Sequence, residues 1–95
     1  MLSTYADHKR HRGELIRLLE SVRDATAAIE GQADSPAVAR WLRHRACCFR
    51  RIAAEHPDEA EMPAGLAEGS ADLDDERAAR IERAIRNAEA VLNGR

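Results

Sequence analysis

The sequence predicts an all-α protein, a small antiparallel three-helix bundle. Apolar residues recur at spacings of three and four in three segments, near residues 4–30, 36–56 and 71–92. Prolines and glycines are few, and most of them stand between these segments. β-branched and aromatic residues are too scarce to build a sheet. Because the connections are short, consecutive helices should lie side by side and run in opposite directions.

Length and composition indicate one small domain with a thin core. The chain has 95 residues, so we expect residues 1–95 to form a single helical domain. Only about one residue in five has a large apolar side chain, and alanine is the commonest residue. Alanine favours helix but buries little area, so an isolated bundle would be weakly stable. We therefore expect an oligomer, most simply a homodimer, or a complex with a protein partner.

The first segment has an apolar stripe that changes character towards the N-terminus. The stripe consists of Leu15, Leu18, Leu19, Val22, Thr26 and Ile29, and the helix should end before Gly31. Continued upstream at the same spacing, the stripe passes through His11, His8 and Thr4. Gly13 lowers helix propensity, which allows a break at that point.

The second segment has the clearest boundaries in the chain. Ser35 can cap the helix, Pro36 suits its first position, and Pro57 ends it. The predicted packing arc carries Val38, Trp41, Leu42, Cys48, Phe49, Ile52 and Ala53. Arg45 projects from the middle of this arc, so it requires a carboxylate on a neighbouring helix or a groove that binds an anion. The carboxylates expected at its height are those of Glu20, Asp24, Glu82 and Glu89.

The third segment follows residues 57–70, which read as an acidic loop because they contain two prolines and two glycines. Acidic residues at 72–76 suit the positive end of a helix dipole, so the helix should begin near residue 71. Its predicted stripe is Leu73, Ile81, Ala84, Ile85, Ala88, Val91 and Leu92.

Charge is distributed unevenly along the chain. Residues 35–54 hold five arginines and no acid, whereas residues 55–76 hold nine acids and no lysine or arginine. We define the basic face as the outer side of the second helix, formed by Arg40, Arg43, His44, Arg50 and Arg51. This face could meet nucleic-acid phosphates, an acidic protein partner, the acidic segment of a second copy, or the acidic segment of its own chain. A solvated charged surface is the simplest alternative.

Histidines indicate a second candidate site. If the first two helices are antiparallel, His56 comes close to His8 and His11, and the carboxylates near enough to add ligands are those of Asp7, Glu14, Asp58 and Asp72. Three imidazoles and a carboxylate would suit zinc or another divalent metal. The spacing matches no recognised zinc motif, and polar residues at the end of a bundle are the alternative interpretation.

The adjacent cysteines point in directions about 100° apart on a helix, so they neither ligate one ion together nor form a disulfide. Cys48 should pack as a small apolar residue, and Cys47 should be exposed. Reduced thiols and the lack of a signal sequence predict a cytoplasmic protein.

No apolar run is long enough to span a membrane. No phosphate-binding loop or convergent polar set indicates a small-molecule substrate or an enzyme. We expect a non-catalytic binding, adaptor or regulatory protein that uses the basic face, with metal binding as the alternative.

Overall fold

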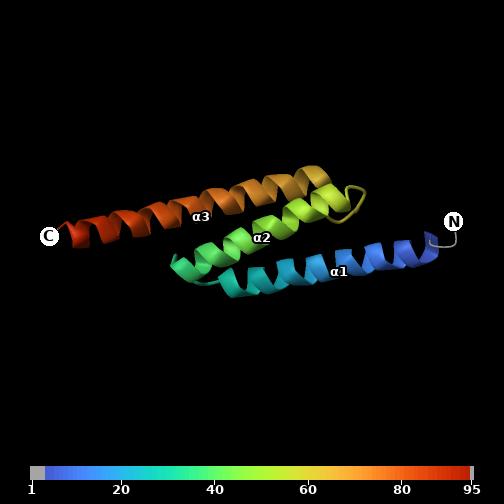
Figure 1. Cartoon of the computed structure of the whole chain (residues 1–95), viewed down its shortest axis with the longest axis horizontal. Coiled ribbons are helices and arrows are strands. Elements are labelled where there is room, and N and C mark those ends of the chain that lie inside the picture. The colour runs from blue at the N-terminus through green and yellow to red at the C-terminus, as the bar shows by residue number, and fades with distance from the viewer. Residues whose placement is uncertain (1–3, 95) are drawn as a thin grey trace.

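A computed structural model describes residues 4–94, which form three α-helices: α1 (Thr4–Ile29), α2 (Pro36–Glu55) and α3 (Ala64–Asn93). The prediction of an all-α fold is confirmed, since the described residues contain no strand. Figure 1 shows the chain turning back on itself after α1 and again after α2. Over the described range, no helix combines the length and the apolar character needed to cross a membrane.

The boundaries of α2 follow the sequence signals. The Ser35 hydroxyl accepts a hydrogen bond from the Val38 backbone N–H at 3.2 Å, and Pro36 takes the first helical position. Before this cap, Gly31 turns the chain with a φ of 73°, in the left-handed region that favours glycine. At the other end, the backbone N–H of His56 donates to the Ile52 carbonyl at 2.8 Å, and Pro57 follows.

The start of α3 differs from the prediction. The helix begins at Ala64 rather than near residue 71, so the predicted loop over 57–70 is shorter than expected. Ala67 and Ala71 are fully buried in a cluster with Phe49 of α2. This packing offsets the cost of Gly65 and Gly69, which is about 1 kcal/mol per glycine relative to alanine. Helix α1 likewise continues without interruption through Gly13.

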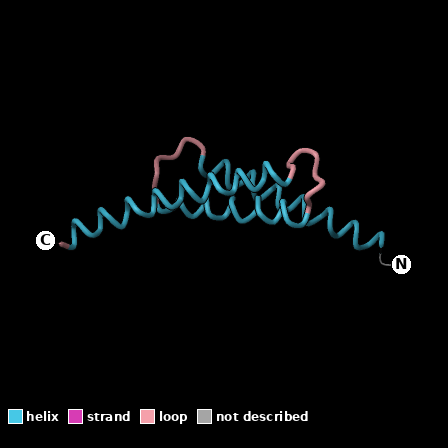
Figure 2. Tube along the Cα trace, turned by 90° about the horizontal axis from the view of Figure 1, so that it is seen from above, coloured by secondary structure: helices cyan, strands magenta, loops and turns pink. Residues whose placement is uncertain are grey.

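Helix α2 holds the three helices together. It packs against both α1 and α3, whereas no Cα atom of α1 lies within 8 Å of one in α3 among residues 4–94. Figure 1 shows α2 between its two neighbours. The molecule measures 67 × 23 × 21 Å, and Figure 2 shows the start of α1 and the end of α3 projecting beyond α2 at opposite ends.

The core is a narrow seam along α2. Its largest fully buried side chains are Leu42 and Ile52. Leu15 and Leu18 of α1 pack with Ile52, and Ile81 of α3 packs with Leu42. Alanine supplies nearly half of the buried apolar residues among the described ones: Ala25, Ala39, Ala46, Ala53, Ala67, Ala71 and Ala78.

Several residues predicted to pack are exposed instead. Trp41 is 39% exposed and meets the ring of His44 edge-on, with 5.9 Å between ring centroids. Leu73 is 67% exposed because the buried stripe of α3 passes through Asp74 instead. Val91 and Leu92 are exposed, and they lie on the end of α3 that projects beyond α2.

Arg45 satisfies the requirement for a carboxylate, but not with any of the four predicted partners. Its Nε and Nη2 atoms donate to the two carboxylate oxygens of Asp74 on α3, each at 2.7 Å. Its Nη1 atom donates to the hydroxyl of Thr26 on α1 at 3.0 Å, and the guanidinium lies 5.9 Å from the centroid of the Phe49 ring. The side chain of Asp74 is 8% exposed and that of Arg45 is 19% exposed. One α2 side chain therefore links the two helices that do not pack on each other.

We predict that Asp74→Ala destabilises the fold by about 3 kcal/mol, because the mutation leaves a largely buried guanidinium without its carboxylate. Replacing both partners by apolar residues, in Arg45→Met/Asp74→Leu, should recover most of this loss. Urea unfolding followed by circular dichroism measures both free energies. Glu55→Ala is the control: it removes the exposed ion pair with Arg51 and should change stability by less than about 1 kcal/mol. Equal destabilisation by Asp74→Ala and Glu55→Ala would contradict the idea that the buried Arg45–Asp74 pair matters more to stability than an exposed pair.

Candidate functional site

The basic face packs against carboxylates of α3. Arg43 donates to Asp75 at 2.9 Å and to Glu82 at 2.6 Å. Arg50 donates to Asp72 at 3.1 Å and also to the second carboxylate oxygen of Asp75. Asp75 therefore joins the two arginines, and both are bonded to acids of their own chain.

The other three residues of the basic face make no ion pair with α3. Arg51 pairs with Glu55, one helical turn later, at 3.3 Å. His44 contacts Trp41 and places a ring nitrogen 3.8 Å from the sulfur of Cys48. Arg40 makes no ion pair with any of residues 4–94. The structure thus keeps the five predicted residues exposed on α2, but three of the four arginines pair with acids of the same chain: Arg43 and Arg50 with α3, and Arg51 within α2.

Electrostatics at Asp75 reflect this pairing. Desolvation raises the pKa of its carboxyl group, but hydrogen bonds from Arg50 and Arg43 outweigh that effect and hold the pKa below its ordinary value. The ionised form of Asp75 is therefore favoured in the folded protein, where it fastens α2 to α3.

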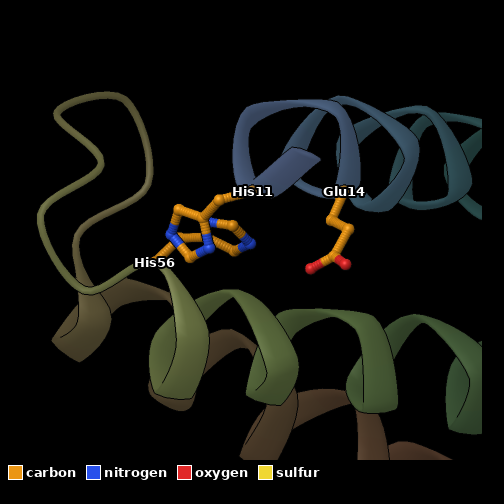
Figure 3. Close-up of side chains that lie close together, drawn as sticks. All are labelled: His11, Glu14 and His56. Carbon is orange, nitrogen blue, oxygen red and sulfur yellow. The ribbon is translucent and has the colours of Figure 1, made fainter. Parts of the chain in front are cut away.

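A second cluster lies where the end of α2 meets α1. His56 caps α2, and its ring stacks against that of His11 from α1, with centroids 4.0 Å apart and planes tilted by 37°. Figure 3 shows these rings overlapping and the carboxylate of Glu14 reaching down from α1 beside them. One possible ligand atom from each of the three residues lies within 4.8 Å of those of the other two. His56 is 5% exposed, and its Nε2 atom has no hydrogen-bond partner.

The cluster opens into a surface groove of about 370 Å³. His8 lines this groove but is not among the three residues whose ligand atoms converge. Of the three predicted histidines, the structure therefore brings His11 and His56 together, and the carboxylate of Glu14 is the third group that converges with them. His11 and Glu14 are three residues apart on α1, a helical spacing that places both side chains on one side of the helix.

The environment of His56 favours its neutral form. Desolvation, followed by the nearby His11, lowers the pKa of the His56 imidazole, while the carboxylates of Glu55, Glu14 and Glu59 act in the opposite direction. The net pKa lies below the ordinary value for histidine, about 6.5. At neutral pH the ring therefore carries no charge, which is the state in which a ring nitrogen can bind a metal ion.

The two thiols occupy the environments predicted for them, with Cys48 buried and Cys47 exposed. Desolvation, with a smaller contribution from Cys47, raises the pKa of the Cys48 thiol. Cys48 is thus a protonated apolar residue of the core, and its sulfur packs with Leu15, Leu18 and Ile52.

The chain gives no match to protein-family models, to curated proteins or to solved structures.

We predict that Asp75 contributes less than about 1 kcal/mol to stability at pH 6, because the pairs that it forms are partly solvated. Its folded-state pKa is depressed, so this contribution is present above the unfolded pKa of about 3.9 and is lost as pH falls through the folded pKa. The difference in free energy of unfolding between the parent and Asp75→Asn should therefore shrink from pH 6 towards pH 3. Carboxyl carbon NMR gives the Asp75 pKa directly, and a value above 3.9 would contradict the pairing.

Proposed function

We propose that this chain is a small, non-catalytic helical binding protein that acts by self-association, in which a second copy covers the side formed by α1 and α3. The observation that carries this proposal is the number of large apolar side chains exposed outside the core. The exposed residues are Tyr5, Ile16, Trp41, Leu66, Leu73, Val91 and Leu92. All but Trp41 belong to α1 or α3, the two helices that do not pack against each other.

Helix α3 presents a second apolar stripe beside the buried one. Leu66, Leu73 and Val91 are separated by 7 and 18 residues, so at 100° per residue they lie within about 20° of one another. Each is more than half exposed. At the same 100° per residue, Ser70 lies about 40° from Leu66 around the helix, and Ala84 lies in line with Leu66, so both fall on the same stripe. A stripe with this spacing is suited to packing against another helix.

The dimensions of this side agree with a dimer interface. Thirty residues of α3 extend for about 45 Å, at 1.5 Å per residue. The molecule is just over 20 Å wide, so the face that runs along the whole of α3 covers about 900 Å², compared with about 800 Å² per partner in a standard interface. A net charge of −2 gives two copies little overall repulsion.

A second copy also suits the energetics of the core. Because alanine buries little area, the separate chain gains limited hydrophobic stabilisation from its own packing. If the helices of a second copy packed against α1 and α3, the exposed leucines would be buried as well. We therefore propose a cytoplasmic homodimer, with the interface on α1 and α3 rather than on the basic face.

Binding of nucleic acid or an acidic protein to the basic face is the weaker proposal. The carboxylates of Asp72, Asp75 and Glu82 already accept hydrogen bonds from Arg43 and Arg50. A phosphate would have to displace these carboxylates before either arginine could bind it. This competition favours a protein contact made elsewhere on the molecule.

We predict that the parent chain is a dimer at micromolar concentration and that Leu66→Glu/Leu73→Glu is a monomer. Both leucines are exposed in the separate chain, so the variant should keep its helical circular dichroism. Light scattering coupled to size exclusion measures the mass. Arg86→Glu is the matched control, because Arg86 is an exposed residue about 160° around α3 from Leu66 and should leave the dimer intact. A parent chain that stays monomeric even at about 100 times this micromolar concentration would refute the proposal.

We predict that fluorescence anisotropy detects no binding of the parent to random-sequence duplex DNA at micromolar concentration and 100 mM salt. Phosphate contacts would instead give an affinity that falls with salt, with a log–log slope near −0.9 per contact. If such binding is seen and is lost in Arg43→Ala/Arg50→Ala, the basic face binds nucleic acid and self-association is not its principal role.

A further inference from the structure

The ring of His56 is buried and carries a polar atom that no other group in the described part of the chain satisfies. It is 5% exposed, and its Nε2 atom has no hydrogen-bond partner. One possible ligand atom of His11 and one of Glu14 lie within 4.8 Å of a ring nitrogen of His56 and of each other. We propose that His11, Glu14 and His56 bind one divalent transition-metal ion, with the chemistry of Zn²⁺, between the start of α1 and the end of α2. This inference is independent of the proposed self-association.

The geometry needs only a small closure. Metal–nitrogen distances of about 2.0–2.1 Å and metal–oxygen distances of about 2.0–2.2 Å place two ligand atoms of a tetrahedral site about 3.4 Å apart. The three atoms in the structure are separated by at most 4.8 Å, so side-chain rotations that bring them up to about 1.4 Å closer complete the site. His11 is exposed and Glu14 is half-buried, which leaves both free to rotate towards the fixed ring of His56.

The ligand set indicates the class of metal. Two imidazoles and one carboxylate form a set that suits zinc and its borderline neighbours and leaves a fourth position open for water. Calcium and magnesium prefer oxygen ligands throughout, so this set disfavours them. The thiols are not part of the site: Cys48 packs in the core, and Cys47 lines a separate groove with Arg43 and Arg50.

The surroundings carry the charge expected around a cation. Glu55, Asp58 and Glu59 line the same groove as the two histidines, and Arg12 is the only arginine or lysine that lines it. Three carboxylates beside one arginine, with Glu14 in addition, give the site a net negative charge. Positive charge brought by a metal ion would therefore be stabilised there.

A metal ion would also fasten α1 to α2 at a point where apolar packing ends. The buried stripe of α1 stops at Leu15, and upstream of it the helix is exposed or half-buried. The ion would join two side chains of α1 to the residue that caps α2. Since the three residues converge only in the folded chain, an ion bound to them favours folding.

We expect Zn²⁺ at 100 times its dissociation constant to raise the melting temperature of the full chain by about 10–20 °C. Isothermal titration calorimetry should give one Zn²⁺ per chain. His11→Ala and Glu14→Gln should remove or strongly reduce the thermal shift. Both replace side chains outside the core, so these variants should fold without metal as the parent does. His56→Ala should also lose the thermal shift, but it removes a buried side chain and should lower the stability of the metal-free chain as well.

Three matched controls separate this site from other zinc ligands. His8→Ala changes a neighbouring residue of the same groove, His44→Ala changes an exposed histidine elsewhere, and Cys47→Ser removes the exposed thiol. All three should keep the thermal shift and the stoichiometry.

Absence of zinc-dependent heat and thermal shift in the parent would overturn the proposal. So would retention of both signals in His11→Ala and Glu14→Gln, or their loss in Cys47→Ser. The monomeric Leu66→Glu/Leu73→Glu variant should still bind one ion per chain, which distinguishes failure of this site from failure of the proposed self-association.

Discussion

The guanidinium group of Arg45 constrains the arrangement of all three helices. It projects from the apolar side of α2 and is bonded to Asp74 on one neighbour and to Thr26 on the other. This contact requires Asp74 to face inward, and that orientation of α3 turns Leu73 outward. A buried ion pair of this kind is weak evidence for added stability, but it can define how helices are aligned.

The same contact explains why the molecule is open on one side. In a closed bundle of three helices, each helix packs against both of the others. Here the Arg45 side chain links α1 to α3, and each apolar cluster is built around residues of α2. The exposed leucines of α3 are a consequence of this arrangement, and the ion pairs of Arg43 and Arg50 secure the opposite edge of α2.

Features that depend on one helix could be predicted from the sequence. The cap of α2 at Ser35, its end before Pro57 and the separate environments of the cysteines follow from local propensity and from 100° rotation per residue. The proximity of His11 and His56 followed from a reversal of the chain between α1 and α2.

Features that depend on the rotation and height of one helix relative to another were not predicted. Predicting them requires the alignment between helices. They are the partner of Arg45, the exposure of Leu73, and the convergence of Glu14 rather than His8 with the other two histidines. The early start of α3 was missed because its glycines lower helix propensity, while the compensating burial of Ala67 and Ala71 is a tertiary effect.

The abundance of alanine in the core also affects how the protein responds to temperature. The heat capacity change on unfolding rises with the apolar area exposed, by about 0.45 cal/mol/K for each Å². A chain in which nearly half of the buried apolar residues are alanines exposes less of this area than one built on leucine and phenylalanine. Its free energy of unfolding should therefore vary with temperature along a shallow curve, with cold and heat denaturation far apart and a broad melting transition.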